Sequence, residues 1–289
     1  MRDYAITTDS SCDFDQALAD SLGVTVVPLS VQIGPRRFRN APGEAMDSHS
    51  FYQLLSQGEL AQTSAPNVEE FKAVWRPILQ SGRDLLYLGF SSGLSGTYHN
   101  AAIAAEDLRE EFPEARIITV DTLCASLGQG MLVDLTVQEK RQGKTLDEVA
   151  AFAEKNRLHL CHWFTVGDLS QLRRGGRLSA GKAIVGNLLN IKPVLHVDDE
   201  GHLVPMASAK GRKKSIEALV SHMEESAVAP EQQRVYISHG DCLADAQLLA
   251  QMVRDRLHVS SVTIGDVGPV IGAHSGAGTL ALFFVGTHR

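Results

Sequence analysis

The sequence predicts an α/β protein made of two α/β lobes, with a mainly parallel sheet in the N-terminal lobe and a mixed sheet in the C-terminal lobe. Short apolar runs of strand length alternate with helical patterns along the whole chain, which is typical of this architecture. The chain has 289 residues, of which 44% are hydrophobic and 21% charged. That length and composition suit two compact domains with buried cores. We place the domain boundary near Asn156, which gives lobes of residues 1–156 and 157–289.

The N-terminal lobe is predicted to alternate strands with helices. Asn67 is the expected N-cap of one helix, because its side chain can accept a backbone hydrogen bond. Glu69 and Glu70 follow in the first turn, where the helix dipole favours negative charge. The strands are expected at Tyr4–Thr8, Val24–Ile33, Leu85–Phe90 and Arg116–Val120, and a short extended piece at Gln62–Pro66. The helices are expected at Asp15–Leu22, Asn67–Gln80, Gly96–Glu111, Leu127–Arg141 and Leu146–Lys155.

The C-terminal lobe has more strand-like runs and fewer helical patterns. Asp198–Gly201 is expected to turn a β-hairpin between two strands. The last two strand-like runs, Val267–Ala273 and Thr279–Val285, flank a glycine-rich turn that contains His274. The other strands are expected at Leu158–Val166, Lys192–Val197, Leu203–Ala209, Arg234–Ser238 and Val259–Gly265. Helical segments are expected at Leu169–Arg173, Ser215–Glu225 and Ala244–Leu257.

Composition excludes several classes of protein. The formal net charge of −7 argues against a nucleic-acid-binding protein. No run approaches the roughly 20 apolar residues that span a bilayer, so no stable membrane insertion is expected. Met1–Asp9 shows no secretory signal pattern. The four cysteines contain no C-x-x-C pair, which predicts a reducing, cytoplasmic location rather than a disulfide framework; they are Cys12, Cys124, Cys161 and Cys242.

The serine- and glycine-rich loop Ser91–Thr97 joins a predicted buried strand to a helix. Such a junction presents unpaired backbone N–H groups and the positive end of the helix dipole, which suits an anion. The hydroxyl groups of Ser92 and Ser95 can donate to a carboxylate or a phosphate. The alternative is that Ser95 only caps the helix.

Gly89-x-Ser91-x-Gly93 also matches a nucleophile elbow, and the order of Ser91 and His274 suits a hydrolase triad. In an elbow the helix begins directly after the serine, whereas here Gly-Leu-Ser-Gly intervenes before the helix. No oxyanion segment of the H-G-G-G type lies upstream. We therefore do not expect Ser91 to be a nucleophile.

Three further segments carry groups that could bind an anion. Thr63 and Ser64 lie in an extended piece, although their residue types alone favour a simple helix entry. Asp168–Arg177 places Arg173, Arg174 and Arg177 beside two glycines, and guanidinium groups suit carboxylate or phosphate. A solvated surface turn is the equal alternative for that segment.

The segment Lys210–Lys214, which contains Arg212, places four cations before a helix, where they oppose the dipole. This arrangement indicates an anionic ligand or partner, or else a basic turn screened by salt. His274 could donate to an anion or be structural. The cluster of His159, Cys161 and His162 lacks the spacing of a metal site, so no metal is expected.

Taken together, these segments resemble the DegV family along essentially the whole chain. Their order and spacing carry the resemblance, since each segment alone would be weak. Ala65 stands where the family more usually has Gln, while the two preceding hydroxyl residues are kept. The matching segments are Ile6–Asp13, Thr63–Pro66, Ser91–Thr97, Val120–Thr122, Arg173–Ser179, Lys192–Leu195 and Gly268–Gly278.

The resemblance implies two lobes with one long-chain fatty acid buried between them. A tail of roughly 15 CH₂ groups, each worth about 0.8 kcal/mol on burial, can supply most of the affinity. By the same resemblance the carboxylate is held by Thr63, Ser95 and His274, with Ser64 and Ser92 as second choices.

In the family, members that work with an ATP-dependent fatty acid kinase present the carboxylate to that separate subunit. The residues that match partner or phosphate contacts there are Arg177, Arg212 and Arg173. We expect no cofactor and no catalytic residue in the chain itself. The alternatives are a Ser91-dependent acyl-ester hydrolase and a carrier of another small ligand.

Overall fold

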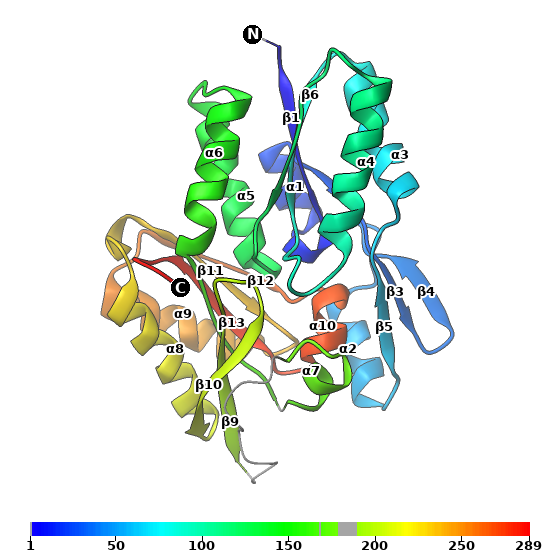
Figure 1. Cartoon of the computed structure of the whole chain (residues 1–289). Coiled ribbons are helices and arrows are strands. Elements are labelled where there is room, and N and C mark those ends of the chain that lie inside the picture. Colours follow the sequence, from blue (N-terminus) through cyan, green and yellow to red (C-terminus); the bar gives the residue numbers. More distant parts are fainter. Residues whose placement is uncertain (1, 168, 179–189) are drawn as a thin grey trace.

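The computed structural model describes residues 2–167, 169–178 and 190–289 (Figure 1). Asp168, which begins the arginine segment, and Ser179, which ends the segment that matches the family, lie outside the described residues.

The N-terminal half contains a four-stranded sheet in the order β2-β1-β6-β7, in which all neighbours are parallel. Two pairs of helices cover its two faces (Figure 1). The predicted parallel sheet is therefore confirmed. The strands are β1 (Tyr4–Asp9), β2 (Thr25–Val27), β6 (Asp84–Gly89) and β7 (Ile117–Asp121). The helices are α3 (Val68–Gln80) and α4 (Thr97–Glu111) on one face, and α5 (Ser126–Arg141) and α6 (Leu146–Asn156) on the other; α1 (Gln16–Leu22) packs beside the second pair.

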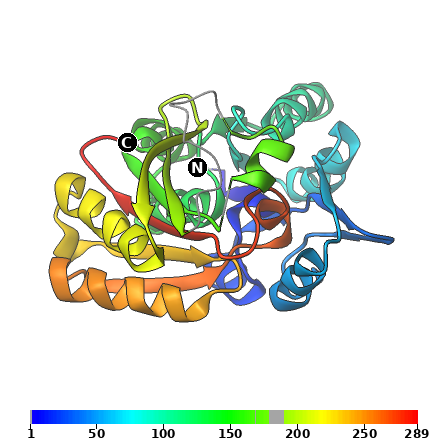
Figure 2. The same cartoon turned by 90° about the horizontal axis from the view of Figure 1, so that it is seen from below.

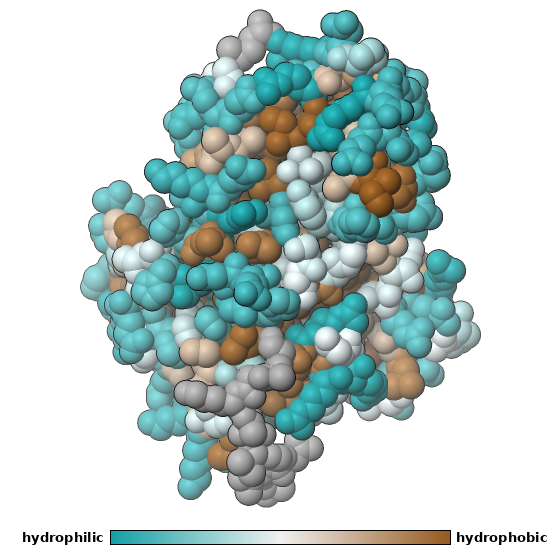
Figure 3. Space-filling model, in the orientation of Figure 1, coloured by the Kyte–Doolittle hydropathy of each residue, from teal (hydrophilic) through white to brown (hydrophobic). Residues whose placement is uncertain are grey.

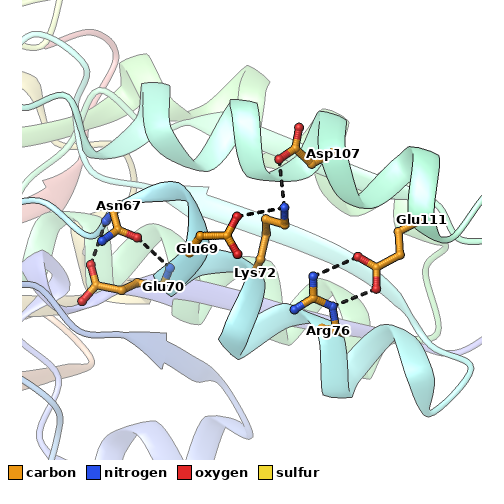
Figure 4. Close-up of polar contacts among 7 residues, drawn as sticks. All are labelled: Asn67, Glu69, Glu70, Lys72, Arg76, Asp107 and Glu111. Atoms are coloured by element: carbon orange, nitrogen blue, oxygen red, sulfur yellow. Dashed lines mark hydrogen bonds and ion pairs between the residues drawn. The ribbon is translucent and has the colours of Figure 1, made fainter.

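Polar contacts fix the start of α3 and its packing against α4 (Figure 4). The Asn67 side chain accepts from the Glu70 backbone N–H at 3.0 Å, and the Glu70 carboxylate accepts from the Asn67 N–H at 2.8 Å. This reciprocal capping box confirms the predicted N-cap. Lys72 then bridges Glu69 of its own helix and Asp107 of α4, both at 3.0 Å. A pair between Arg76 and Glu111 joins the same two helices at 2.8 Å.

The C-terminal half contains a six-stranded mixed sheet in the order β10-β9-β8-β13-β11-β12, in which only β11 and β12 are parallel. Helices α8 (yellow) and α9 (orange) lie side by side on one face, as Figure 2 shows, and α5 packs on the other face. The prediction of a mixed sheet is confirmed. The strands are β8 (Leu160–Thr165), β9 (Ile191–Val197), β10 (Leu203–Lys210), β11 (Arg234–His239), β12 (Ser261–Asp266) and β13 (Leu280–Val285). The helices are α8 (Arg212–Ser226) and α9 (Leu243–Leu257).

The β9–β10 hairpin turns where it was predicted, at Asp198–Gly201. The Asp198 carboxylate accepts from the backbone N–H groups of Glu200 at 3.0 Å and His202 at 2.8 Å. Aspartate stabilises tight turns through contacts of this kind, and Gly201 supplies a positive φ of 79°.

A small third sheet was not predicted. Val24–Ile33, expected as one strand, divides into β2 and β3 (Ser30–Ile33) around Pro28, which has no backbone N–H to donate to a ladder. β3 pairs antiparallel with β4 (Arg36–Arg39) and with β5 (Ala61–Ser64). The same region contains α2 (Ser48–Ser56), capped by Asp47, which accepts from the Ser50 N–H at 2.9 Å. In Figure 1 these elements project from one side of the molecule.

Two element assignments were wrong. Val267–Ala273, expected as a strand, is mostly helical, since α10 spans Pro269–Ser275. The residues at its two ends are typical of a helix, because Pro269 occupies the first turn and Gly276, with a φ of 80°, ends the helix. Helix α8 begins at Arg212 rather than Ser215, so Arg212, Lys213 and Lys214 lie in its first turn, while Lys210 ends β10. The remaining short elements are α7 (Ser170–Arg174), η1 (Ser10–Cys12), η2 (Arg157–His159) and η3 (Pro230–Gln232). The domain boundary near Asn156, where α6 ends, stays a prediction.

A polar bridge connects the N-terminal and C-terminal halves at the start of α5. Ser126 donates to the Asp13 carboxyl at 2.5 Å and lies 3.0 Å from the Ser238 hydroxyl of β11. The Gly268 N–H donates to the other Asp13 oxygen at 3.1 Å. Burial raises the pKa of Asp13 to about 8, although these two hydrogen bonds oppose the rise. The bridge is therefore held by a neutral carboxylic acid at neutral pH.

We predict that Asp13→Asn weakens the pH dependence of stability. The folded chain keeps the Asp13 proton up to about pH 8, whereas the unfolded chain releases it near pH 4. The contribution of Asp13 to the stability of the wild-type protein is therefore lost as the pH rises from about 4 to about 8. Asparagine imitates the protonated acid and tolerates the left-handed backbone at position 13, where φ is 55°. Thermal melts between pH 5 and pH 8 should show a flatter Tm profile for the variant.

The matched control is Asp199→Asn, which removes an exposed carboxyl from the β9–β10 turn. That variant should keep the wild-type slope. An Asp13→Asn profile parallel to the wild-type one would contradict the assignment.

Candidate functional site

A cavity of about 240 Å³ lies between the loops of the parallel sheet and the inner face of the mixed sheet. Both halves of the chain line it, and most lining side chains are apolar. Its size is just below the range of about 300–1,000 Å³ that is usual for small-molecule pockets. The apolar lining comprises Leu29, Ala65, Phe90, Leu94, Ala125, Phe164, Leu172, Val197, Leu203, Val267, Val270, Ile271, Ala281 and Phe283. By contrast, the surface in Figure 3 is mostly hydrophilic with separate apolar patches.

Thr63 and His274 meet at the cavity wall although they are far apart in the sequence. The Thr63 hydroxyl lies 2.8 Å from Nε2 of His274, and both residues line the cavity. Thr63 comes from β5, where it pairs with Val31 of β3, and His274 comes from the last turn of α10. When Nε2 carries the imidazole proton, it donates to Thr63 and leaves the threonine hydroxyl free to donate to a ligand oxygen.

The imidazole of His274 is neutral at physiological pH. Burial, and secondly the neighbouring Arg177 guanidinium, together lower its pKa to about 4. The only full positive charge among these groups therefore belongs to Arg177. The pair can hydrogen-bond an acid without a histidine cation.

Arg177 and Ser95 also line the cavity. Arg177 donates to the Leu94 carbonyl at 3.2 Å and also to the Gly175 carbonyl, which fixes the guanidinium against the serine loop. Ser95 lies 2.8 Å from the Thr97 hydroxyl and accepts from the Thr97 N–H at 3.3 Å. Gly96, the N-cap of α4, lines the cavity beside them. The start of α4 thus brings N–H groups without intrahelical partners to this position.

Four of the predicted site residues do not line this cavity. Ser64 is exposed, because alternation along β5 turns it away from Thr63. Ser92 is exposed, and its backbone N–H donates to Asp121 at 3.2 Å. Arg173 is exposed on the last turn of α7. Arg212 pairs with Asp245 of α9 at 2.8 Å.

Ser91 has a structural environment rather than that of a nucleophile. Its side chain is fully buried and donates to the Gly201 carbonyl in the β9–β10 turn at 2.8 Å. It also accepts from the Gly93 N–H at 3.2 Å. A side chain at Gly201 would clash with this hydroxyl, since a Cβ there would lie 2.1 Å from it. His274, the base that a hydrolase would need, is bonded to Thr63 instead.

Within the described ranges, no cluster of three or more His, Cys, Asp or Glu side chains could hold a metal ion. His162, one of the residues considered as a metal ligand, makes other contacts instead. Its Nδ1 bonds to the Leu160 carbonyl at 2.8 Å, and its ring packs edge-on against Phe283. No helix in the same part of the chain is long and apolar enough to cross a membrane.

Neither the apolar wall nor the Ser126–Ser238 pair was predicted from the sequence. Ala281 and Phe283 lie two residues apart on β13, so they face the same side of the sheet. That alternation was a usable signal. Ser126 and Ser238 had no such signal, because only the packing of α5 against β11 brings them together.

Three relatives show where this chain belongs. A DegV domain-containing protein of Clostridium perfringens is 41% identical over 99% of this chain and 98% of its own length. A solved DegV lipid-binding protein from Thermotoga maritima is 28% identical, with a TM-score of 0.88 and 99% of each chain covered. A DegV family protein from Thermus thermophilus, whose solved structure concerns fatty acid binding, is 33% identical, with a TM-score of 0.87 and coverage of 98% and 99%.

The family model described as "Uncharacterised protein, DegV family" matches residues 3–287, nearly the whole chain. The match includes both sheets and every polar residue of the cavity wall described above. The chain therefore belongs to the DegV family.

Proposed function

We propose that this protein binds one long-chain fatty acid in the cavity, with the carboxylate at Thr63, Ser95 and His274. The single observation that carries the proposal is an apolar cavity with a compact polar group in its wall, where Thr63 and His274 lie 2.8 Å apart. The lining matches an amphipathic ligand with one polar end and a long apolar tail. The fatty-acid- and lipid-binding neighbours with 28% to 33% identity support the same ligand class.

The expected energetics assign most of the affinity to the apolar tail and the positioning to the carboxylate head group. A tail of roughly 15 CH₂ groups at about 0.8 kcal/mol each offers about 12 kcal/mol before the costs of association. The head group needs few contacts for affinity, but it needs exact placement for any reaction on the carboxylate. Arg177 offsets the negative charge of the acid, while neutral His274 and the hydroxyls orient its oxygens.

We further propose that a separate ATP-dependent kinase subunit phosphorylates the bound carboxylate. Arg177 contacts the serine loop at the cavity, and Arg173 is exposed four residues before it, so both suit a partner or phosphate contact. Arg212 could serve such a partner only after leaving its ion pair with Asp245. Ser64 and Ser92, being outside the cavity lining, would act only after a rearrangement of their loops.

We predict that the purified protein carries a fatty acid of about 16–18 carbons, because burial of such a tail offsets the costs of binding. Native mass spectrometry should detect the complex, and extraction should identify the acid. Apo protein alone, even after incubation with palmitate and oleate, would count against the proposed function.

We predict that Ser95→Ala and Thr63→Ala each remove a hydrogen bond to the carboxylate, which is worth about 1.5–3 kcal/mol of head-group recognition. Affinity for the acid should fall less than the rate of acyl phosphate formation with a kinase, since the tail supplies most of the binding. The double variant should be less damaging than the sum, because both groups share one ligand carboxylate. Calorimetry and kinase-coupled turnover measure the two effects.

Ser208→Ala is the matched control, since it removes an exposed hydroxyl from β10. Strict additivity of the two cavity variants would argue against one shared carboxylate site.

We predict that Ser91 does not react with a fluorophosphonate probe, because its hydroxyl donates to the Gly201 carbonyl and no base contacts it among the described residues. Intact-protein mass spectrometry after labelling measures this. Stoichiometric labelling that disappears in Ser91→Ala would restore the hydrolase alternative.

A further inference from the structure

The two hydroxyl groups proposed to hold the carboxylate lie on parts of the chain that no strand pairing connects. Thr63 belongs to β5 of the small sheet, whose ladders join only β3, β4 and β5. Ser95 lies in the loop between β6 of the parallel sheet and α4. Both residues line the cavity. Because one carboxylate has to reach both hydroxyls at hydrogen-bond distance, another contact must fix the small sheet against the start of α4.

Asn100 makes such a contact. It lies on α4 one turn after Gly96, and its backbone N–H donates to the Gly96 carbonyl at 3.1 Å. Its side-chain Nδ2 donates to the carbonyl of Pro66 at 2.9 Å, three residues after Thr63. Among the described residues, this is the one hydrogen bond that joins β5 and the Pro66 turn to the Ser95 loop and α4.

The orientation of the Asn100 amide is determined by its partner. Rotating the amide by 180° would place the side-chain oxygen against the Pro66 carbonyl oxygen, so the NH₂ group has to face Pro66. Pro66 is buried and comes directly before Asn67, the N-cap of α3, so its carbonyl accepts no hydrogen bond of that helix. In the described part of the chain that carbonyl has no other donor. Loss of the Asn100 side chain therefore leaves a buried carbonyl without a partner.

We propose that Asn100 is a positioning residue that sets the spacing of the Thr63 and Ser95 hydroxyls, and thereby the preference of the cavity for a carboxylate over an uncharged head group. Asn100 is not among the residues that line the cavity, so it acts through these two hydroxyls rather than on the ligand. The proposal rests on the fatty acid function proposed above.

The competing role of Asn100 is structural. Its contact with Pro66 could serve only the packing of α4 against α3, as the ion pair between Arg76 and Glu111 does farther along the same two helices (Figure 4). A structural contact of that kind affects the stability of the fold, whereas a positioning contact changes which head group the cavity prefers. The two roles are therefore separated by a ratio of affinities for two ligands that share one tail.

The test compares oleate with oleyl alcohol, which has the same tail and an uncharged head group. Both displace a fluorescent fatty acid from the delipidated full chain. Wild-type protein should bind oleate at least about 10-fold tighter, because hydrogen bonds to a charged group are the stronger ones. Asn100→Ala should lower this ratio by about 3- to 10-fold, mainly by weakening oleate. Alanine favours a helix, so α4 should remain folded.

Asn100→Asp is the second variant, because it keeps the shape of the side chain while its ionised carboxylate cannot donate to Pro66. A negative charge near the start of α4 suits the helix dipole, so this variant should also fold. It should lower the ratio at least as much as Asn100→Ala, since two oxygens then face each other.

A double variant shows whether Asn100 acts through Thr63. In a Thr63→Ala background, Asn100→Ala should change the ratio by less than about twofold, because the hydroxyl that it positions is already absent. Arg76→Ala is the matched control, since it breaks a 2.8 Å ion pair between the same two helices. It should leave the ratio within about twofold of the wild-type value.

Two results would overturn this proposal alone. Both Asn100 variants could keep the wild-type ratio. Alternatively, the loss in Asn100→Ala could be equalled by Arg76→Ala or persist in full in the Thr63→Ala background, which would assign Asn100 to helix packing. Wild-type protein that fails to bind oleate, or that binds it no tighter than oleyl alcohol, would refute the carboxylate site itself, and so separates the two failures.

Discussion

The close approach of α5 to both sheets is the constraint on which the rest of the structure depends. Every residue from Ser126 to Asp134 is buried, and the helix belongs to one core that contains residues of both sheets. Glycine makes this approach feasible. A Cβ at Gly128 would lie 2.2 Å from His162 Nε2, and one at Gly130 would lie 2.5 Å from Phe14. A helix buried on several sides suits such a central position.

The cavity follows from that arrangement. In the parallel sheet, β1 and β6 end at the same edge, and the chain segments that follow their carboxyl ends reach the inner face of the mixed sheet. Ligands of open α/β sheets bind at such edges. Here Ser91 bonds to the Gly201 carbonyl and Arg177 to the Leu94 carbonyl, so the serine loop is tied to the C-terminal half. The cavity is the space that remains between the start of α5, these loops and β13.

The elements that sequence could predict are those whose signals are local. The capping box of α3, the buried run of β6 and the Asp198 turn each depend on neighbouring residues. Helix α10 was taken for a strand because its apolar residues fill a run too short to show helical periodicity. Thr63, Ser95, His274 and Arg177 were found through the family resemblance, and all four line the cavity. Ser126 and Ser238 depend on packing between distant segments, which no local pattern reveals.

Burial determines which polar groups in the cavity wall and beside it carry a charge. Desolvation keeps His274 neutral and Asp13 protonated, so each hydrogen-bonds as an uncharged group. Arg177 keeps its charge because the guanidinium is effectively always protonated, and backbone carbonyls of Leu94 and Gly175 hold it. One fixed cation beside neutral hydrogen-bond donors suits a single carboxylate, because this set of groups orients its oxygens without binding its charge very tightly. Under the proposed function, an additional buried cation would bind the acid more tightly, but it would also hold the carboxylate oxygen that has to attack a phosphoryl group.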